Sequence, residues 1–154
     1  MNKEEVLIHL REAKLAHKEW VQKAKLLIEG FKMDKNAIPV NATSCAFGKW
    51  FYSDAQKLNG LRNNPLECMQ NVEDYHTRLH TIYLNIFKIY YSNDDKGFLK
   101  KLFGVKRRVT PTEKEIALNY YEEIEAVSKQ LIDELNRMER RIIALSDEEV
   151  EKIK

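Results

Sequence analysis

The chain has 154 residues, a length that fits one domain of ordinary size. Hydrophobic residues make up 44% and charged residues 32%, which excludes a disordered tail and an integral membrane protein. Only 5 Gly and 3 Pro are present, too few for a turn-rich all-β fold. The 26 Lys and Arg nearly balance the 24 Asp and Glu, and this net charge of +2 does not indicate a nucleic-acid partner.

The N-terminus enters a polar, periodic segment directly, without the apolar region of a signal peptide. No apolar run approaches the roughly 18 residues of a membrane-spanning helix. Cys45 and Cys68 are therefore expected to be reduced thiols, and the cytoplasm is the expected compartment.

In the first predicted helix, apolar positions recur at alternating spacings of four and three residues, which is one face of a helix. These positions are Val6, Leu10, Ala13, His17, Trp20, Ala24, Leu27 and Phe31. A histidine, His17, stands where a hydrophobic residue is expected. Gly30 and the loop through Pro39 end the helix.

A short second helix is predicted to begin near Thr43 or Ser44, because either hydroxyl can cap the first N–H groups of a helix. It carries Cys45, Phe47, Trp50 and Phe51. The third helix is predicted to begin at Asn64 and Pro65, a typical cap and first helical position. Its inward face is Met69, Val72, His76, Leu79, Tyr83, Phe87 and Tyr90, again with a histidine in the series.

A basic and apolar segment within residues 96–109 follows the third helix. Such a segment could dock a partner or an anionic surface. The alternative, which we favour, is a solvated connector whose apolar side covers the end of the bundle.

The last helix begins at a capping box formed by Thr110 and Glu113, with Pro111 at the first helical position. Its inward face is Ile116, Tyr120, Ile124, Val127, Leu131, Leu135, Met138, Ile142 and Leu145. The patterns together predict an all-α fold, an antiparallel four-helix bundle with an additional short helix that carries the Cys motif. We expect one domain over residues 1–145 and a polar tail over 146–154.

His76 and His80 are four residues apart, so a helix presents both imidazoles on one face, as in helical metal sites. Taken alone, this pair is a weak signal that fits hydrogen-bonded polar groups at the core edge better than a metal site, and His17 or Cys45 alone fits an ordinary core residue. Together the four residues supply three imidazoles and one thiolate from helices that share a core, which is a complete tetrahedral set for Zn²⁺. His9 is eight residues before His17, roughly 12 Å along a helix, so both cannot bind one ion. Cys68 precedes His76 by the same eight residues.

At these residues the sequence resembles the chemoreceptor zinc-binding (CZB) domain family. The resembling segments are Ala16-His17-Lys18-Glu19-Trp20, Cys45-Ala46-Phe47-Gly48-Lys49-Trp50 and His76-x-x-x-His80. The resemblance implies a bacterial cytoplasmic sensor domain that binds zinc through His17, Cys45, His76 and His80, with Cys45 responsive to oxidants such as hypochlorous acid. It also implies a homodimer and a signalling partner such as a chemotaxis receptor or a diguanylate cyclase, of the chemotaxis or cyclic-di-GMP type.

Residues around the ligands have supporting roles in this interpretation. Trp20, Phe47 and Trp50 are expected to pack around the site and keep water out. Gly48 within a helix costs up to about 1 kcal/mol relative to Ala, so it is expected to permit a close approach near the metal; a tolerated surface glycine is the alternative.

Other functions fit the sequence less well. A di-iron enzyme needs a second Glu-x-x-His motif beside Glu73-x-x-His76, and a hemerythrin-like site takes five histidines. Zinc hydrolysis needs an open coordination position, which four protein ligands close, so no catalysis is expected. The competing hypothesis is a structural zinc bundle that acts as a protein-interaction adaptor.

Overall fold

The structure is a computed structural model, and it describes residues 2–61, 66–91 and 108–152. Three of the helices are long: α1 (Lys3–Ile28), α3 (Leu66–Tyr90) and α5 (Pro111–Ala144). Three more elements are short: α2 (Ala46–Phe51), the 3₁₀ helix η1 (Asp54–Gly60) and α6 (Asp147–Glu151). The predicted all-α helical bundle, with a short helix at the Cys motif, is confirmed.

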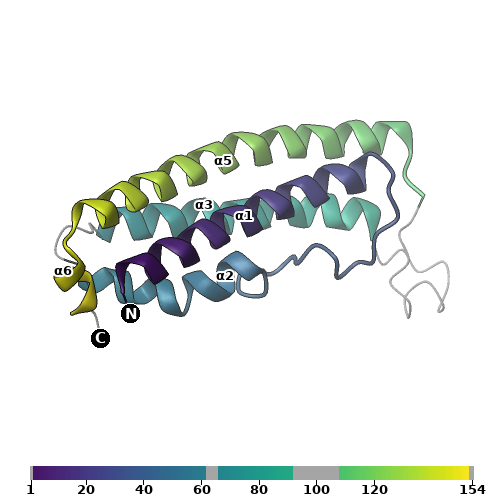
Figure 1. The fold of residues 1–154 in the computed structure, drawn as a ribbon. Helices are drawn as coiled ribbons and strands as arrows, with labels where there is room; N and C mark the ends of the chain where they lie inside the picture. The colour runs from purple at the N-terminus through teal and green to yellow at the C-terminus, as the bar shows by residue number, and fades with distance from the viewer. Residues whose placement is uncertain (1, 62–65, 92–107, 153–154) are drawn as a thin grey trace.

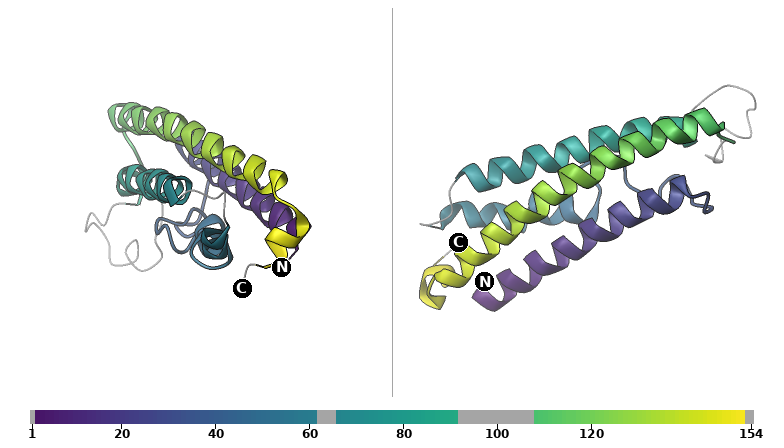
Figure 2. Two further views of the ribbon diagram at one scale, coloured as in Figure 1. Left: turned by 90° about the vertical axis from the view of Figure 1, so that its left-hand side faces the viewer. Right: turned by 90° about the horizontal axis from the view of Figure 1, so that it is seen from above.

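Figure 1 shows α1 and α3 running in one direction and α5 in the opposite direction. The chain returns from the end of α1 through a loop and then through α2 and η1, so this second leg is helical only in its later half. α5 packs against both α1 and α3, and α2 packs against α1. The views in Figure 2 show α2 on the side of α1 and α3 that faces away from α5.

Helix α1 begins at a capping box, in which Asn2 and Glu5 satisfy each other's backbone N–H groups. Its predicted inward face is buried from Val6 to Leu27, including His17 and Trp20. Phe31 is an exception, because its side chain is 57% exposed. The helix ends at Ile28, and Gly30 adopts a left-handed φ of 100°, so Phe31 no longer continues the helical face.

Helix α5 has the predicted capping box of Thr110 and Glu113. Its inward face is buried as predicted from Ile124 onward, but Ile116 is 44% exposed and Tyr120 is only half-buried. Ala117 and Tyr121 are buried in their place. Successive helical residues are about 100° apart around the axis. Ile116, eight residues before Ile124, is therefore about 80° away from it around the axis, whereas Ala117, seven residues before Ile124, is only about 20° away.

The ends of the bundle differ in how much the structure describes. Asn64, Pro65 and most of the segment 96–109 lie outside the described residues. Where a polar tail was expected, α6 forms behind a Ser146 cap and buries Val150. In the described part of the chain, no helix is long and apolar enough to cross a bilayer.

Candidate metal centre

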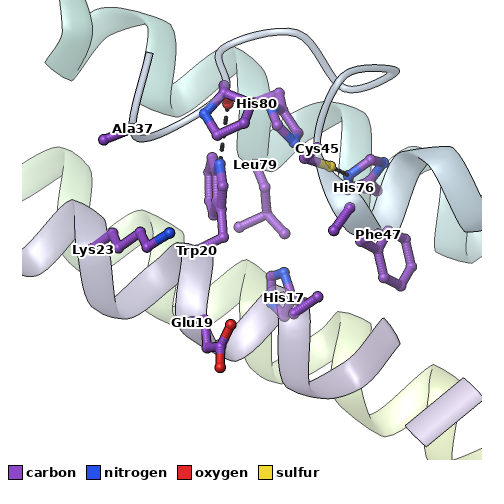
Figure 3. Close-up of a pocket in the computed structure, with 13 residues that line it drawn as sticks. His17, Glu19, Trp20, Lys23, Ala37, Cys45, Phe47, His76, Leu79 and His80 are labelled. Carbon is purple, nitrogen blue, oxygen red and sulfur yellow. Dashed lines mark hydrogen bonds between the residues drawn. The ribbon is translucent and has the colours of Figure 1, made fainter. Parts of the chain in front are cut away.

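A cavity of about 180 Å³ lies between α1 and the elements α2 and α3, near the middle of the bundle. Figure 3 shows its walls, to which α1 contributes His17 and Trp20, and α3 contributes His76 and His80. Cys45 and Phe47, at the start of α2, line the same cavity. Side chains that are far apart in the sequence therefore meet here, as the sequence motifs predict.

Three of the four predicted ligands converge closely. One donor atom each of Cys45, His76 and His80 lies within 4.8 Å of the others, and all three residues are buried. The Cys45 Sγ is 3.2 Å from the His76 Nε2. Ligand atoms that share one tetrahedral zinc are separated by roughly 3.3–3.6 Å, as follows from Zn–N and Zn–S lengths of about 2.0 and 2.3 Å. The donor types therefore fit a zinc ion, and the distance between the Cys45 Sγ and the His76 Nε2 is close to this separation.

Hydrogen bonding settles which nitrogen His80 can offer to a cation. Its Nδ1 is 2.7 Å from the backbone oxygen of Val40, and because a carbonyl only accepts, the Nδ1–H donates. The lone pair of Nε2 is therefore free, which is the arrangement of most zinc-binding histidines. The Nδ1 of His76, in contrast, is buried without a hydrogen-bond partner among the described residues.

Burial keeps all three cavity histidines neutral at physiological pH, which is the form that binds metals. Desolvation, reinforced by the charge of His80, lowers the pKa of His17 to about 4 and that of His76 to about 3. Desolvation also lowers the pKa of His80, against the opposing effect of its backbone hydrogen bond.

Burial has the opposite consequence for the thiol, since it raises the pKa of Cys45 above the ordinary value. Backbone N–H groups and Lys49 oppose this shift without overcoming it. The start of α2 thus favours a thiolate at Cys45, but desolvation outweighs this effect. A bound cation would supply the missing positive charge.

Cys45 itself is the N-cap of α2, because its Sγ accepts a hydrogen bond from the Gly48 N–H at 3.2 Å. The prediction of Thr43 or Ser44 as the cap is wrong. Thr43 donates both its N–H and its hydroxyl to the Asn41 side chain, so it belongs to the preceding turn. Cysteine is outside the usual set of capping residues, and sequence preferences alone therefore pointed to its neighbours.

Gly48 permits a very close approach between α2 and the loop before it. A Cβ on this residue would lie 1.7 Å from the Ala42 backbone oxygen and 3.2 Å from the His76 Cε1. The glycine is buried, so the alternative of a tolerated surface glycine does not describe it.

His17 lines the cavity from the α1 side but stands apart from the three converging donors. Its Nε2 is 2.8 Å from the hydroxyl oxygen of Ser128 on α5. Sequence reasoning missed Ser128, since no motif links it to a histidine 111 residues away. Its only signal is that it follows Val127, a predicted inward-facing residue.

Two of the three predicted aromatic neighbours border the cavity. Trp20 packs on His80 and Phe47 packs on His76, each with ring centroids 4.7 Å apart. The Trp20 Nε1 also donates to the Pro39 backbone oxygen, which holds the loop against α1. Trp50 lies behind Phe47, at a centroid distance of 5.6 Å, and does not line the cavity.

The two residues excluded by spacing lie elsewhere. His9 lines a separate small pocket with Trp50 and Asp54. Cys68 is buried beside Glu134 of α5.

Residues 17–86 match the model of the chemoreceptor zinc-binding domain family. The chain contains a chemoreceptor zinc-binding domain. All four predicted ligands lie within the matched residues, whereas Ser128 does not. Neither the curated proteins nor the solved structures include a significant match to this chain.

Proposed function

We propose that this chemoreceptor zinc-binding domain holds one Zn²⁺ through His17, Cys45, His76 and His80 and acts as a sensor in bacterial signal transduction. The observation that carries the proposal is the convergence of one buried thiol and two buried, neutral imidazoles within 4.8 Å. Imidazole and thiolate are ligands that zinc prefers. His17 is included because it faces the same cavity and supplies the fourth donor.

Four protein ligands would leave no open coordination position, so the site suits regulation rather than catalysis. Bound zinc would hold Cys45 as a thiolate. A thiolate reacts with hypochlorous acid to give a sulfenic acid and chloride, so sulfur loses two electrons and chlorine gains them. Cys45 borders the cavity, through which we expect a small oxidant to reach it.

Oxidation of Cys45 removes the only anionic ligand and leaves three neutral imidazoles, so the affinity for the cation falls. His17 is the one proposed ligand on α1, while the others lie on or beside α2 and α3. Loss of the shared cation therefore frees α1 to shift relative to α2 and α3. This displacement is the proposed signal.

The setting of the sensor follows from the same proposal. Cys45 and Cys68 are both free thiols, which fits the reducing cytoplasm. The family description points to chemoreceptors. We propose a homodimeric domain that acts on a chemotaxis receptor or a diguanylate cyclase.

Metal analysis of the purified protein tests the zinc site. We expect one Zn²⁺ per chain, with most of it lost in Cys45→Ala and in His76→Ala. His9→Ala and Cys68→Ala serve as matched controls and are expected to retain zinc, because both residues lie outside the cavity. Iron, two metals per chain, or unchanged zinc in Cys45→Ala would refute the proposal.

A structural zinc bundle that serves as an adaptor is the second candidate, because the buried donors come from different elements and a cation would fasten them together. Chelation distinguishes the two functions. A sensor stripped of zinc should stay helical in circular dichroism while its conformation or dimerisation changes, whereas an adaptor held together by structural zinc should unfold.

A further inference from the structure

His17 is tied to a part of the chain that the proposed metal site does not include. The Ser128 hydroxyl is 2.8 Å from the His17 Nε2, and it comes from α5, the helix that packs against both α1 and α3. The His17 ring is 3% exposed, so this hydrogen bond is made in the protein interior.

The hydrogen bond at one ring nitrogen of His17 determines whether the other nitrogen can bind a cation. A neutral imidazole has one N–H donor and one lone pair, on different sides of the ring. The Nε2 of His17 is engaged by Ser128, and Nδ1 makes no hydrogen bond with the part of the chain that the structure describes. If Nε2 carries the proton and donates it to the hydroxyl oxygen, the lone pair is on Nδ1.

We propose that Ser128 is a positioning residue of the metal centre, which accepts a hydrogen bond from the His17 Nε2–H and leaves Nδ1 as the metal ligand. This inference rests on the proposed zinc site. His80 offers a direct parallel, because Val40 accepts its Nδ1–H and leaves Nε2 free. Each of the two histidines is thus oriented by a partner from outside its own helix, a device common to metal-binding histidines.

The hydrogen bond also gives α5 a defined connection to the site. His17 lies on α1 and Ser128 on α5, so a movement of either helix changes the orientation of a ligand. Coupling between two equilibria is reciprocal, so binding of the cation at His17 in turn stabilises the observed packing of α1 on α5.

The test compares zinc affinity in wild type, Ser128→Ala and Ser128→Thr by competition with a chelating dye. Loss of a hydrogen-bond partner behind a ligand typically lowers metal affinity roughly 10- to 100-fold, and we expect Ser128→Ala to fall in this range. Ser128→Thr keeps the hydroxyl and should restore most of the affinity. Alanine is a good helix former, so Ser128→Ala should fold, and thermal unfolding of the metal-free variant checks this.

A double-mutant cycle with His17→Ala separates positioning from a general structural effect. In the His17→Ala background, Ser128→Ala should cause no further loss of affinity. An equal further loss, or an unchanged affinity in Ser128→Ala alone, would overturn the inference. Tighter binding in Ser128→Ala would also overturn it, because it would show that Ser128 competes with the cation for Nε2. Failure of the wild type to bind zinc would instead refute the proposed function.

Discussion

Replacing Gly48 with alanine would test the packing on which the proposed metal centre depends. The added Cβ would lie 1.7 Å from the Ala42 backbone oxygen, and real Cβ atoms essentially never approach another atom within 3.0 Å. The difference, 3.0 − 1.7 = 1.3 Å, is the least by which α2 and the loop must separate. The obstacle is a backbone oxygen, so rotation of a side chain cannot relieve it.

Overpacking of this kind costs about 1–3 kcal/mol, and the better helix propensity of alanine returns at most about 1 kcal/mol. We therefore expect Gly48→Ala to lower the free energy of unfolding of the metal-free protein by about 1–2 kcal/mol. In a chain of this length that corresponds to a decrease in Tm of roughly 2–8 °C. Zinc affinity should also fall, because Ala42 is three residues before Cys45 and a shifted loop displaces the sulfur.

Urea unfolding of the metal-free protein and a zinc competition titration measure the two effects. Gly60→Ala is the matched control, since a Cβ there meets nothing within 4 Å and its φ is not left-handed. We expect it to change stability by less than about 0.5 kcal/mol. If Gly48→Ala were as stable as Gly60→Ala and bound zinc as tightly as wild type, the close approach would not exist in solution.

Two further predictions concern pH and oxidation. The metal-free protein should lose stability as pH falls below about 6.5, because the unfolded chain takes up protons there while His17 and His76, with pKa values of about 4 and 3, stay neutral in the fold; each should contribute a loss of about 2 kcal/mol by pH 5. Urea unfolding between pH 8 and pH 5 measures this loss, and a flat profile would contradict it. Sub-stoichiometric hypochlorous acid added to the zinc-loaded protein should release zinc in proportion to modification of Cys45, as followed with a chelating dye and peptide mass spectrometry. Zinc release that tracks Cys68 instead would exclude the redox mechanism.

The helices and most of the core could be predicted from the sequence because these depend on local patterns. Periodicity identified the buried faces of α1 and α3, and the capping box at Thr110 placed the start of α5. The errors lie at the ends of helices. Phe31 continues the apolar spacing of α1 in the sequence, but the helix ends before it and its side chain is exposed. Cys45 is the N-cap of α2, although sequence preferences favour Thr43 and Ser44.

In the candidate site, too, the sequence motifs predicted some contacts and not others. The motifs pointed to Cys45, His76 and His80 as neighbours, and these three converge in the structure. The contact of Ser128 with His17 could not be predicted, because it joins two helices through residues that share no motif. The 1.7 Å approach at Gly48 likewise depends on where a loop without regular structure passes.

The energetics of the site support the proposal that a cation affects the packing of the helices. Burial lowers the pKa of His76 and raises the pKa of Cys45, so both side chains are neutral in the metal-free cavity. Both side chains are also largely removed from water. A divalent cation offsets the cost of burying a thiolate, because the sulfur of Cys45 gains a positively charged partner when it loses its proton. Cys45, His76 and His80 already converge, whereas His17 approaches from α1 and is held by α5. Binding or loss of the cation should therefore have its largest structural effect on the position of α1 relative to α2, α3 and α5, rather than on the packing of α3 against α5.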